Sequence, residues 1–489
     1  MWISEEVKAH LSPFFIHFNN IDLTDYVIPI SDTGRGLSQR EVLTRTTPGR
    51  AGGMILSKRT PIRYLSINVL MACDDAAELH SMLEQLSAIL HTDAPAPLTF
   101  SDEPDRIYHA TYSGADEGYW VDGFHQTSIN FVCVDPHKHS EKQSTIVNSS
   151  GIAVIQNNST ADTPPEFRIA VKQPITTLDI FSENGYMRLG KPAPIDQTPI
   201  SPMDRVFWTE ANTLVGWAVG TNPEDGDISG ALKTNGESFY TNEYGTGPRW
   251  HGPAMKTSMS QSIQDFRMDV ELQMDSNSIR QVGGIEVALK DETDNYIAKI
   301  SFKKNFPNET AFYPQIRAGR AASGHSILAE TSANAIVKNK FFGLLRVQRV
   351  GKMWTAEIFE SATLHGVKKL LNRFTWQDDA GIATNAVRQV QVQLKQWTTY
   401  DTPLQRVDDI KVFRLNNVDV NKIPNIAGDG DIIVIDGKKR VILLNDEVRM
   451  DLIGDFGSSF FPLKPGENII STVTPSVAAI EVIHDNLYL

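Results

Sequence analysis

Apolar residues alternate with polar ones through most of this 489-residue chain. In the clearest run every second side chain is apolar: Phe266, Met268, Val270, Leu272 and Met274. A period of two is that of a β-strand with one buried face. Polar turns, such as those at 291–295 and 350–352, separate runs of this kind at short intervals. The chain is therefore predicted to be mainly β and to form sandwiches or jelly rolls.

One segment has the helical period instead. Leu79, Leu83, Leu86 and Leu90 recur at three- and four-residue steps, which places them on one face of a helix. Asp75 can cap its start, and Glu78 three residues later completes a capping box. Two prolines at 95 and 97 end it.

A Gly- and Arg-rich segment at 46–53 interrupts the first strands. Its side chains cannot fill a core, so it is predicted to be a loop or the tip of a long hairpin. The residues that mark it are Pro48, Gly49, Arg50, Gly52 and Gly53.

A Pro-rich stretch near 192–202 has the composition of a linker. The region from 193 to 416 has regularly spaced hairpins and no helical period, as expected for one large sandwich. We predict three domains: residues 1–145; residues 146–192 together with 417–489, as one sandwich split by an insertion; and the insertion itself, 193–416. Insertions survive at exposed turns whose two ends lie close together.

Composition excludes some classes of protein. A net charge of −13 argues against binding to nucleic acid, because phosphate contacts need surplus Lys and Arg. No apolar run approaches the roughly 18 residues of a membrane span, and no secretory signal pattern begins the chain. Cys73 and Cys133 are expected to be buried small hydrophobic residues rather than a disulfide or a zinc site.

The segment 240–251 is the strongest candidate for ligand contact. It combines aromatic rings with Gly and Pro residues, which favour a surface loop. Aromatic faces in sugar-binding domains stack on pyranose rings, and neighbouring polar groups hold the hydroxyls. The candidate carbohydrate-binding residues are Tyr240, Tyr244, Arg249, Trp250 and His251, together with Trp217. The alternative is that these aromatics fill the sandwich core, an arrangement favoured for Trp208, Trp217, Trp354 and Trp397.

Catalysis is not expected. The chain lacks the common metalloprotease, serine hydrolase and nucleotide-binding motifs, and no cofactor is implied. A glycosidase needs two carboxylates facing across a cleft, which a sequence cannot reveal, so a polysaccharide depolymerase remains an alternative. The acidic run at 224–227 lacks regular calcium-loop spacing and is predicted to be a solvated turn, which leaves metal binding open.

Three segments together resemble the distal tail protein (Dit) family of siphophages. They are Leu98–Tyr108, Ile129–Lys138 and Asp455–Asn468, in the order and spacing of that family. The resemblance covers about 1–192 and 417–489. It implies an N-terminal β-sandwich with one helix and a projecting hairpin, which would include 48–53, and a galectin-like sandwich outside it. The shortest members of the family have no counterpart of the insertion, whereas longer members carry carbohydrate-binding modules at such positions.

This resemblance implies a structural role in the virion, after synthesis in the cytoplasm of the bacterial host. Six copies would close into a homohexameric ring through the N-terminal domains and hairpins. The ring would join the tail tube protein to the tail-associated tip protein and receptor-binding protein at the baseplate. The inserted domain would bind host cell-wall polysaccharide. Its alternative role is purely structural, as a docking domain for receptor-binding proteins.

Overall fold

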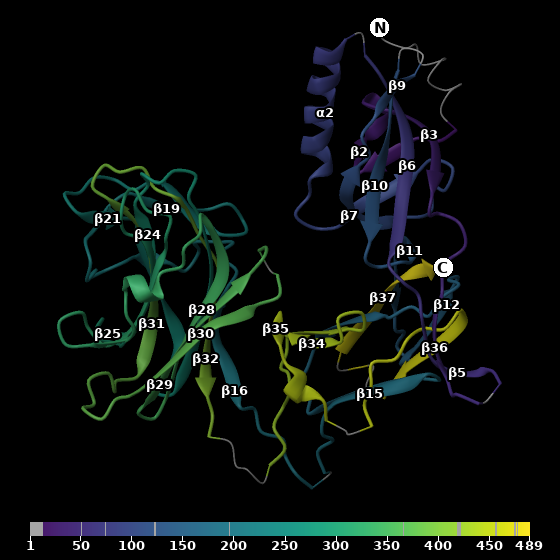
Figure 1. The fold of residues 1–489 in the computed structure, drawn as a ribbon. Coiled ribbons are helices and arrows are strands. Elements are labelled where there is room, and N and C mark those ends of the chain that lie inside the picture. Colours follow the sequence, from purple (N-terminus) through teal and green to yellow (C-terminus); the bar gives the residue numbers. More distant parts are fainter. Residues whose placement is uncertain are drawn as a thin grey trace.

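The computed structural model describes residues 13–49, 51–73, 75–121, 124–194, 196–364, 366–417, 422–454, 457–473, 476 and 478–489. Strands dominate these residues, and their apolar side chains gather in three separate cores. Figure 1 shows the three corresponding units, the first in purple, the second in blue and yellow, and the third in green. The prediction of a mainly β fold is confirmed.

The first unit is an eight-stranded sheet with one helix. Its strand order is β2-β1-β7-β8-β10-β6-β3, with β9 paired to β10. The strands are β1 (Ile16–Phe18), β2 (Ile21–Asp22), β3 (Ile28–Thr33), β6 (Arg63–Ala72), β7 (Ala96–Phe100), β8 (Tyr108–Ala115), β9 (Tyr119–Val121) and β10 (Phe124–Cys133).

This sheet curls over its own core. The rings of Phe18 on β1 and Phe131 on β10 lie 5.2 Å apart between centroids, although two strands separate β1 from β10 in the sheet. A flat sheet would hold them roughly 14 Å apart at its strand spacing. Cys73 and Cys133 lie buried and free in the same core, as expected.

Helix α2 (Ala76–Leu90) covers one side of this core through Leu79, Leu86 and Leu90. The Asp75 carboxylate caps it by accepting the Glu78 backbone N–H at 2.8 Å. The predicted helix and its cap are therefore confirmed.

A two-stranded hairpin, β4 (Glu41–Thr46) and β5 (Gly53–Arg59), projects from the first unit. Every residue of both strands is exposed. Pro48, Gly49 and Gly52 lie at its tip, where the two glycines have positive φ, and Gly53 pairs with Thr46. Arg50 lies outside the described residues.

The second unit, here the carrier sandwich, combines residues from both sides of the insertion. One sheet has the order β11-β37-β13-β33-β34-β35, and the other has the order β12-β36-β14-β15. The strands before the insertion are β11 (Lys138–Ile146), β12 (Ile152–Asn157), β13 (Glu166–Val171), β14 (Thr177–Ser182) and β15 (Gly185–Gly190). Those after it are β33 (Ile432–Asp436), β34 (Val441–Leu444), β35 (Glu447–Val448), β36 (Gly466–Thr472) and β37 (Ala478–Tyr488).

Strand β13 joins the two parts of the carrier sandwich. It pairs on one side with β33 and on the other with β37, so Ile169 lies opposite Ile433 and Ile480. All three side chains are buried in one core. Residues far apart in the chain therefore share one hydrophobic interior.

The first boundary differs from the predicted one. Strand β11 was expected within the first domain, which was placed at 1–145, but it hydrogen-bonds to β37 and belongs to the carrier sheet. Most of its side chains are partly or fully exposed because it is an edge strand. Such a strand lacks the apolar alternation by which a sequence assigns it to a core.

The third unit, the inserted sandwich, runs from β16 to β32. One sheet has the order β19-β20-β32-β23-β28-β29-β30, with β16 also paired to β32. Its strands are β16 (Met203–Thr209), β19 (Ala231–Thr234), β20 (Phe239–Glu243), β23 (Phe266–Asp275), β28 (Lys340–Val350), β29 (Met353–Ser361), β30 (Lys369–Gln377) and β32 (Leu404–Leu415).

The other sheet has nine strands in the order β17-β22-β31-β24-β25-β26-β27, with β21 paired to β31 and β18. Its strands are β17 (Ala218–Val219), β18 (Asp227–Ile228), β21 (Trp250–Gly252), β22 (Ala254–Ile263), β24 (Gly283–Lys290), β25 (Tyr296–Lys304), β26 (Tyr313–Ala318), β27 (His325–Leu328) and β31 (Val387–Trp397). Trp354, expected in the core, is fully buried between the sheets.

Two chain segments connect the inserted sandwich to the carrier, and they lie side by side. Ile200 and Pro424 form a parallel bridge, and the Asn425 N–H donates to the Ile200 carbonyl at 2.9 Å. The insertion thus leaves and re-enters the carrier sandwich at one place.

Candidate functional site

Trp250 and Trp397 form an aromatic rim on the inserted sandwich, where β21 pairs with the end of β31. Trp250 lies directly opposite Trp397 in the antiparallel pair, and their ring centroids are 5.2 Å apart at 67°. Trp397 is 36% exposed, and Tyr400 beyond it is 40% exposed. Trp397, which was expected to pack in the core, therefore lies at the surface beside Trp250.

Charged groups surround this rim. The Arg249 guanidinium, with 60% of its side chain exposed, pairs with Asp227 at 3.2 Å. The Lys303 ammonium lies 5.6 Å from the centre of the Trp250 ring and 3.3 Å from Glu330. A partly exposed ring beside a guanidinium and a carboxylate offers both a stacking face and hydrogen-bond partners for hydroxyl groups.

The loop that contains Gly226 crosses the outer face of the nine-stranded sheet and packs against Trp250. Gly226 in this loop has φ +105°, and a Cβ there would lie 2.0 Å from the Trp250 carbonyl oxygen. Only glycine fits both the backbone angle and the approach. The loop therefore packs directly against the backbone of the rim.

The acidic run at 224–227 is not the solvated turn expected from the sequence. Glu224 pairs with Arg317, and Asp225 contacts the fully buried Lys299 ammonium at 2.7 Å. The Lys395 ammonium donates to the Asp225 carbonyl at 2.9 Å. Glu224 and Asp225 instead fasten the loop to a buried arginine and a buried lysine of the sheet, partners that local sequence does not reveal.

The same lysines hold the buried carboxyls ionised. Burial alone would raise the pKa of Asp225, but the ammonium groups of Lys299 and Lys395 outweigh it and lower the pKa to about 2. Burial would likewise raise the pKa of Glu286, and Lys395 and Lys299 lower it to about 2. A general acid for glycoside hydrolysis needs a raised pKa, so neither carboxyl is suited to that role.

The other candidate carbohydrate-binding residues lie apart from this rim or beneath it. Trp217 packs against the core, with its ring 5.2 Å from that of Phe239. Tyr244 also packs against the core, and burial raises the pKa of its hydroxyl to about 12. Tyr240 is on β20 in the opposite sheet, and His251 is 1% exposed with its Nδ1 2.8 Å from the Arg249 carbonyl. Of the six candidates, the structure brings only Arg249 and Trp250 together at the surface.

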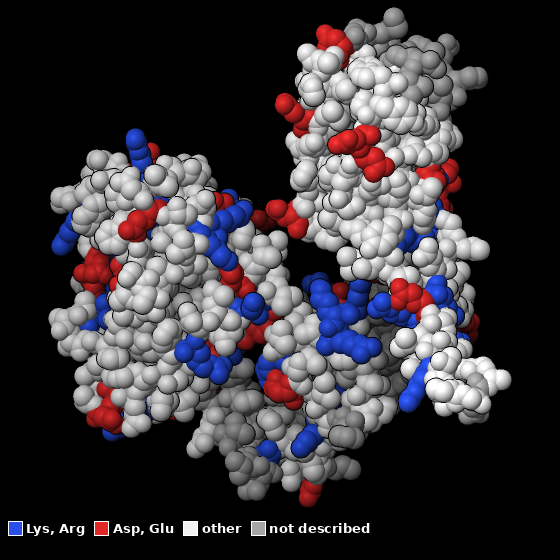
Figure 2. Space-filling view, viewed as in Figure 1, with Lys and Arg blue, Asp and Glu red and all other residues white. Residues whose placement is uncertain are grey.

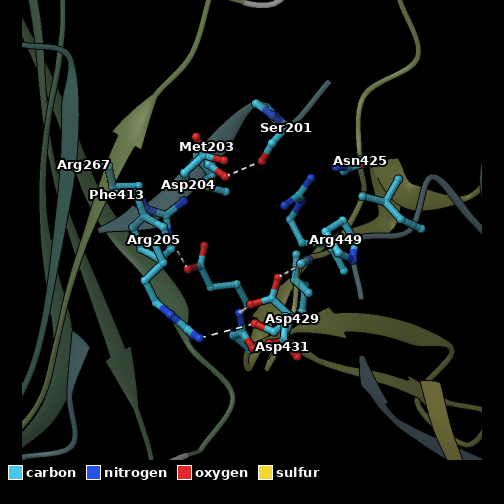
Figure 3. A pocket seen from close by; sticks show the side chains of 18 residues that line it. Ser201, Met203, Asp204, Arg205, Arg267, Phe413, Asn425, Asp429, Asp431 and Arg449 are labelled. Carbon is cyan, nitrogen blue, oxygen red and sulfur yellow. Dashed lines mark hydrogen bonds and ion pairs between the residues drawn. The ribbon is translucent and has the colours of Figure 1, made fainter. Parts of the chain in front are cut away.

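A pocket of about 320 Å³ lies between the inserted sandwich and the carrier sandwich. Figure 3 shows three arginines around it, Arg205, Arg267 and Arg449. Arg267 pairs with Glu447 at 3.0 Å, and Arg449 pairs with Asp451 at 2.8 Å. Because these charges contact each other across and around the pocket, it is a joint between two units rather than a prepared ligand site.

Within the described residues no group of three or more His, Cys, Asp and Glu side chains is placed to hold a metal ion. No helix in the described part of the chain is long and apolar enough to span a bilayer.

Two family models match the outer parts of the chain. A phage tail protein RIFT-related domain matches residues 18–133. The C-terminal domain of a siphovirus-type tail component matches residues 396–488. The second match begins in the last strands of the inserted sandwich and continues through β33–β37.

The distal tail protein of Bacillus phage SPP1 is 35% identical over 156 residues, covering 32% of this chain and 61% of that protein. This chain thus aligns with about three-fifths of that relative's length. The crystal structure of the SPP1 Dit protein has 29% identity and a TM-score of 0.34, covering 36% of this chain and 74% of the other.

Two further solved structures resemble the chain more distantly. The CBM2 module of the evolved Dit of Lactobacillus casei BL23 phage J-1 has 12% identity and a TM-score of 0.38, covering 45% of this chain and 100% of the module. The exoplasmic/lumenal domain of VIP36 has 10% identity and a TM-score of 0.30, covering 46% of this chain and 97% of the domain.

Proposed function

We propose that this chain is the hub of a phage tail tip, because its outer parts match two family models of siphophage tail proteins and resemble a distal tail protein. In that role its copies form a homohexameric ring between the tail tube and the tip proteins of the virion. The first unit forms the ring, and the carrier sandwich holds the inserted sandwich away from it. The domain organisation supports this arrangement, because the insertion has its own core and its two connecting segments lie side by side.

The inserted sandwich, in this proposal, binds saccharide of the host cell wall through the aromatic rim. The observation that carries the proposal is the pair of the partly buried Trp250 and the exposed Trp397, beside Arg249 and Asp227. Exposed tryptophan is costly on a surface without a partner, and a sugar ring covers it well. Six copies on one ring raise avidity by as much as about 10²–10⁴, so a weak single site suffices.

Binding of the full chain to host cell walls tests this assignment. Trp250→Ala and Trp397→Ala are each expected to weaken binding about tenfold or more, since truncating a central aromatic commonly costs more than about 1.4 kcal/mol. Trp208→Ala is the matched control, because Trp208 is 43% exposed on the opposite sheet of the same sandwich.

Other outcomes separate the alternatives. Binding that survives both rim variants but is lost in Trp208→Ala would move the site to the other sheet. Binding to purified receptor-binding protein, with none to any glycan, would make the insertion a docking domain. Release of new reducing ends from wall polysaccharide would instead show a depolymerase.

A further inference from the structure

The first unit meets the carrier sandwich at a joint built around β11. Strand β10 ends at Cys133, and the linker 134–137 leads directly into β11. His139 of β11 exchanges two backbone hydrogen bonds with Ile107 of the first unit, each 2.8 Å long, while β11 also pairs with β37 of the carrier. In Figure 1, β11 and β37 lie where the two units meet. The position of the linker therefore affects the orientation of one unit to the other.

Permanent charges also cross the joint. Figure 2 shows both basic and acidic side chains on the surface where the first unit meets the carrier. The Lys138 ammonium of β11 lies 2.5 Å from the Glu103 carboxylate of the first unit. The Arg106 guanidinium lies 3.5 Å from the centre of the Tyr488 ring on β37. Lysine and arginine stay charged across neutral pH, so these contacts hold throughout that range.

The His139 side chain lies between two carboxylates and is 1% exposed. Its Nδ1 is 2.5 Å from the Asp485 carboxylate on β37, and its Nε2 is 3.2 Å from the Asp135 carboxylate in the linker. A neutral imidazole has a single N–H, so one of the two carboxylates would face the lone pair of a ring nitrogen. The arrangement therefore suits the protonated ring, which attaches the linker to β37.

Other titratable groups pack around the same place. The ring of His109 on β8 lies 4.7 Å from that of His139, at 71°. Asp135 also contacts His137 at 2.9 Å and Lys438, from the turn between β33 and β34, at 2.8 Å. Burial, and then the charge of His139, lower the pKa of His109. His109 is therefore the neutral ring of the pair when His139 is charged.

The pKa shifts agree with this geometry. Burial alone would lower the pKa of His139, but its contacts with Asp135 and Asp485 outweigh burial and raise the pKa above its usual 6.5. Burial would raise the pKa of both carboxyls, but His139, together with His137 and Lys438 for Asp135, lowers it for each. The stability that a raised histidine pKa contributes is fully present below pH 6.5 and is lost as the pH rises through the raised value.

We propose that protonation of His139 locks the joint between the first unit and the carrier sandwich, and that rising pH releases it. When the Nε2 proton passes to water, Asp135 faces a lone pair and moves away with the linker, while Nδ1 keeps its proton and its contact with Asp485. The carrier and the insertion then take a wider range of orientations to the first unit. Because the lock lies within one chain, it does not depend on the function proposed above.

A second buried histidine on β37 responds to pH in the opposite direction. His484 is 3% exposed inside the carrier, and neither of its ring nitrogens has a hydrogen-bond partner among the described residues. Burial lowers its pKa, so its protonation destabilises the carrier as the pH falls. Loosening of the joint as the pH rises therefore separates the effect of His139 from that of His484.

Distances between two spin labels in the full chain test the lock. The labels are attached at Gln85→Cys on α2 and at Gln156→Cys on β12, both exposed positions, whereas the two native cysteines are buried. The labelled chain is diluted into excess unlabelled chain, so that an assembly carries a single pair. Double electron–electron resonance should give a narrow distance distribution at pH 6 and a broad one at pH 9, with the ratio of closed to open joint falling about tenfold.

Three further variants assign the transition. His139→Asn should give the broad distribution at both pH values, because Asn cannot carry the charge. Asp485→Asn should move the midpoint of the transition to lower pH, because one of the two carboxylates that favour the charged ring is gone. His80→Asn is the matched control, since it removes an exposed histidine of the first unit and should leave the transition unchanged.

The same measurements can overturn the lock. A distribution that is equally narrow at pH 6 and pH 9, or a transition that persists in His139→Asn, would do so. Circular dichroism of each variant at both pH values shows whether it is folded. If His139→Asn does not fold, Asp485→Asn decides, and an unmoved midpoint in that variant would overturn the lock.

Discussion

Asp408 is a buried carboxyl with unusual surroundings. It is 2% exposed, and neither of its oxygens has a hydrogen-bond partner in the described structure. It is the extra residue of a bulge in β32, beside Glu271 and Asp409. Burial, and then the negative charge of Glu271, raise its pKa to about 7. Its ionisation therefore opposes folding near neutral pH.

Asp408→Asn should stabilise the inserted sandwich, and the gain should depend on pH. Between pH 4 and 7 the folded state keeps a proton that the unfolded state has lost, so wild-type stability falls as pH rises through this window. A raise of about three pKa units sets an upper limit of about 4 kcal/mol, and we expect about 1–4 kcal/mol at pH 8 and little at pH 4. Denaturant unfolding at both pH values measures it, and an equal gain at both would contradict the assignment.

Local sequence located only part of the aromatic rim. The loop composition at 240–251 located the aromatic rim through Trp250 and Arg249. It did not distinguish them from His251, one position later, which points into the protein. Trp397 was missed because its partner is 147 residues away, and only the pairing of β21 with β31 brings the two rings together. The spacing of neighbouring residues does not reveal which strands pair when they lie so far apart in the chain.

At the scale of single elements, the start of α2 can be tested directly. The Asp75 carboxylate is the side-chain cap at the N-terminal end of this helix. Asp75→Ala should lower the stability of the first unit by about 1 kcal/mol, the usual cost of losing such a cap. Asp93→Ala, at an exposed position just after the helix, serves as the control. Thermal unfolding that does not distinguish the two variants would contradict the capping role.

Strand β35 forms the contact between the carrier and the inserted sandwich. Its Glu447 accepts hydrogen bonds from Arg267 at 3.0 Å and from Arg346, and its backbone bridges to Lys368. Both arginines keep Asp269 as a second partner inside the insertion. Loss of Glu447 should therefore loosen the joint without unfolding either sandwich.

We expect Glu447→Ala to widen the distribution of orientations between the two sandwiches. Small-angle scattering of the full chain should show a larger maximum dimension, and the effect should resemble that of high salt on the wild type. Glu467→Ala, at an exposed position of β36, is a control that removes the same charge from the carrier. Unchanged scattering would show that the paired linkers hold the orientation by themselves.

Local patterns predicted the elements of this fold well and their boundaries less well. Apolar alternation located strands such as β23, β24 and β25, and the capping residue located the start of α2. The polar edge strand β11 was assigned to the wrong side of a boundary because exposed strands carry no such alternation. The loop that contains Asp225 and crosses the nine-stranded sheet was also not predicted. Lysines are usually surface residues, and only the structure shows that Lys299 contacts Asp225 and that Lys395 contacts Glu286.

At the scale of the whole molecule, the carrier sandwich is continuous in space although it is interrupted in the chain. All ten of its described strands lie outside 201–423, and Ile200 already contacts Pro424. The insertion contributes none of the side chains of the carrier core. Joining two points that are already in contact with a short flexible linker adds little closure entropy.

Deletion of 201–423, with a linker of about four Gly and Ser residues, should therefore leave a folded protein. The shortened chain should keep the cores of the first unit and the carrier, assemble as the full chain does, and lose binding to cell walls. Circular dichroism, native mass spectrometry and the binding assay test these three properties separately. A shortened chain that fails to fold with any of several linker lengths would mean that the carrier needs its insertion, because the Arg267 and Arg346 contact to β35 would then be part of its stability. A chain that folds but no longer assembles would instead place the inserted sandwich among the contacts between copies.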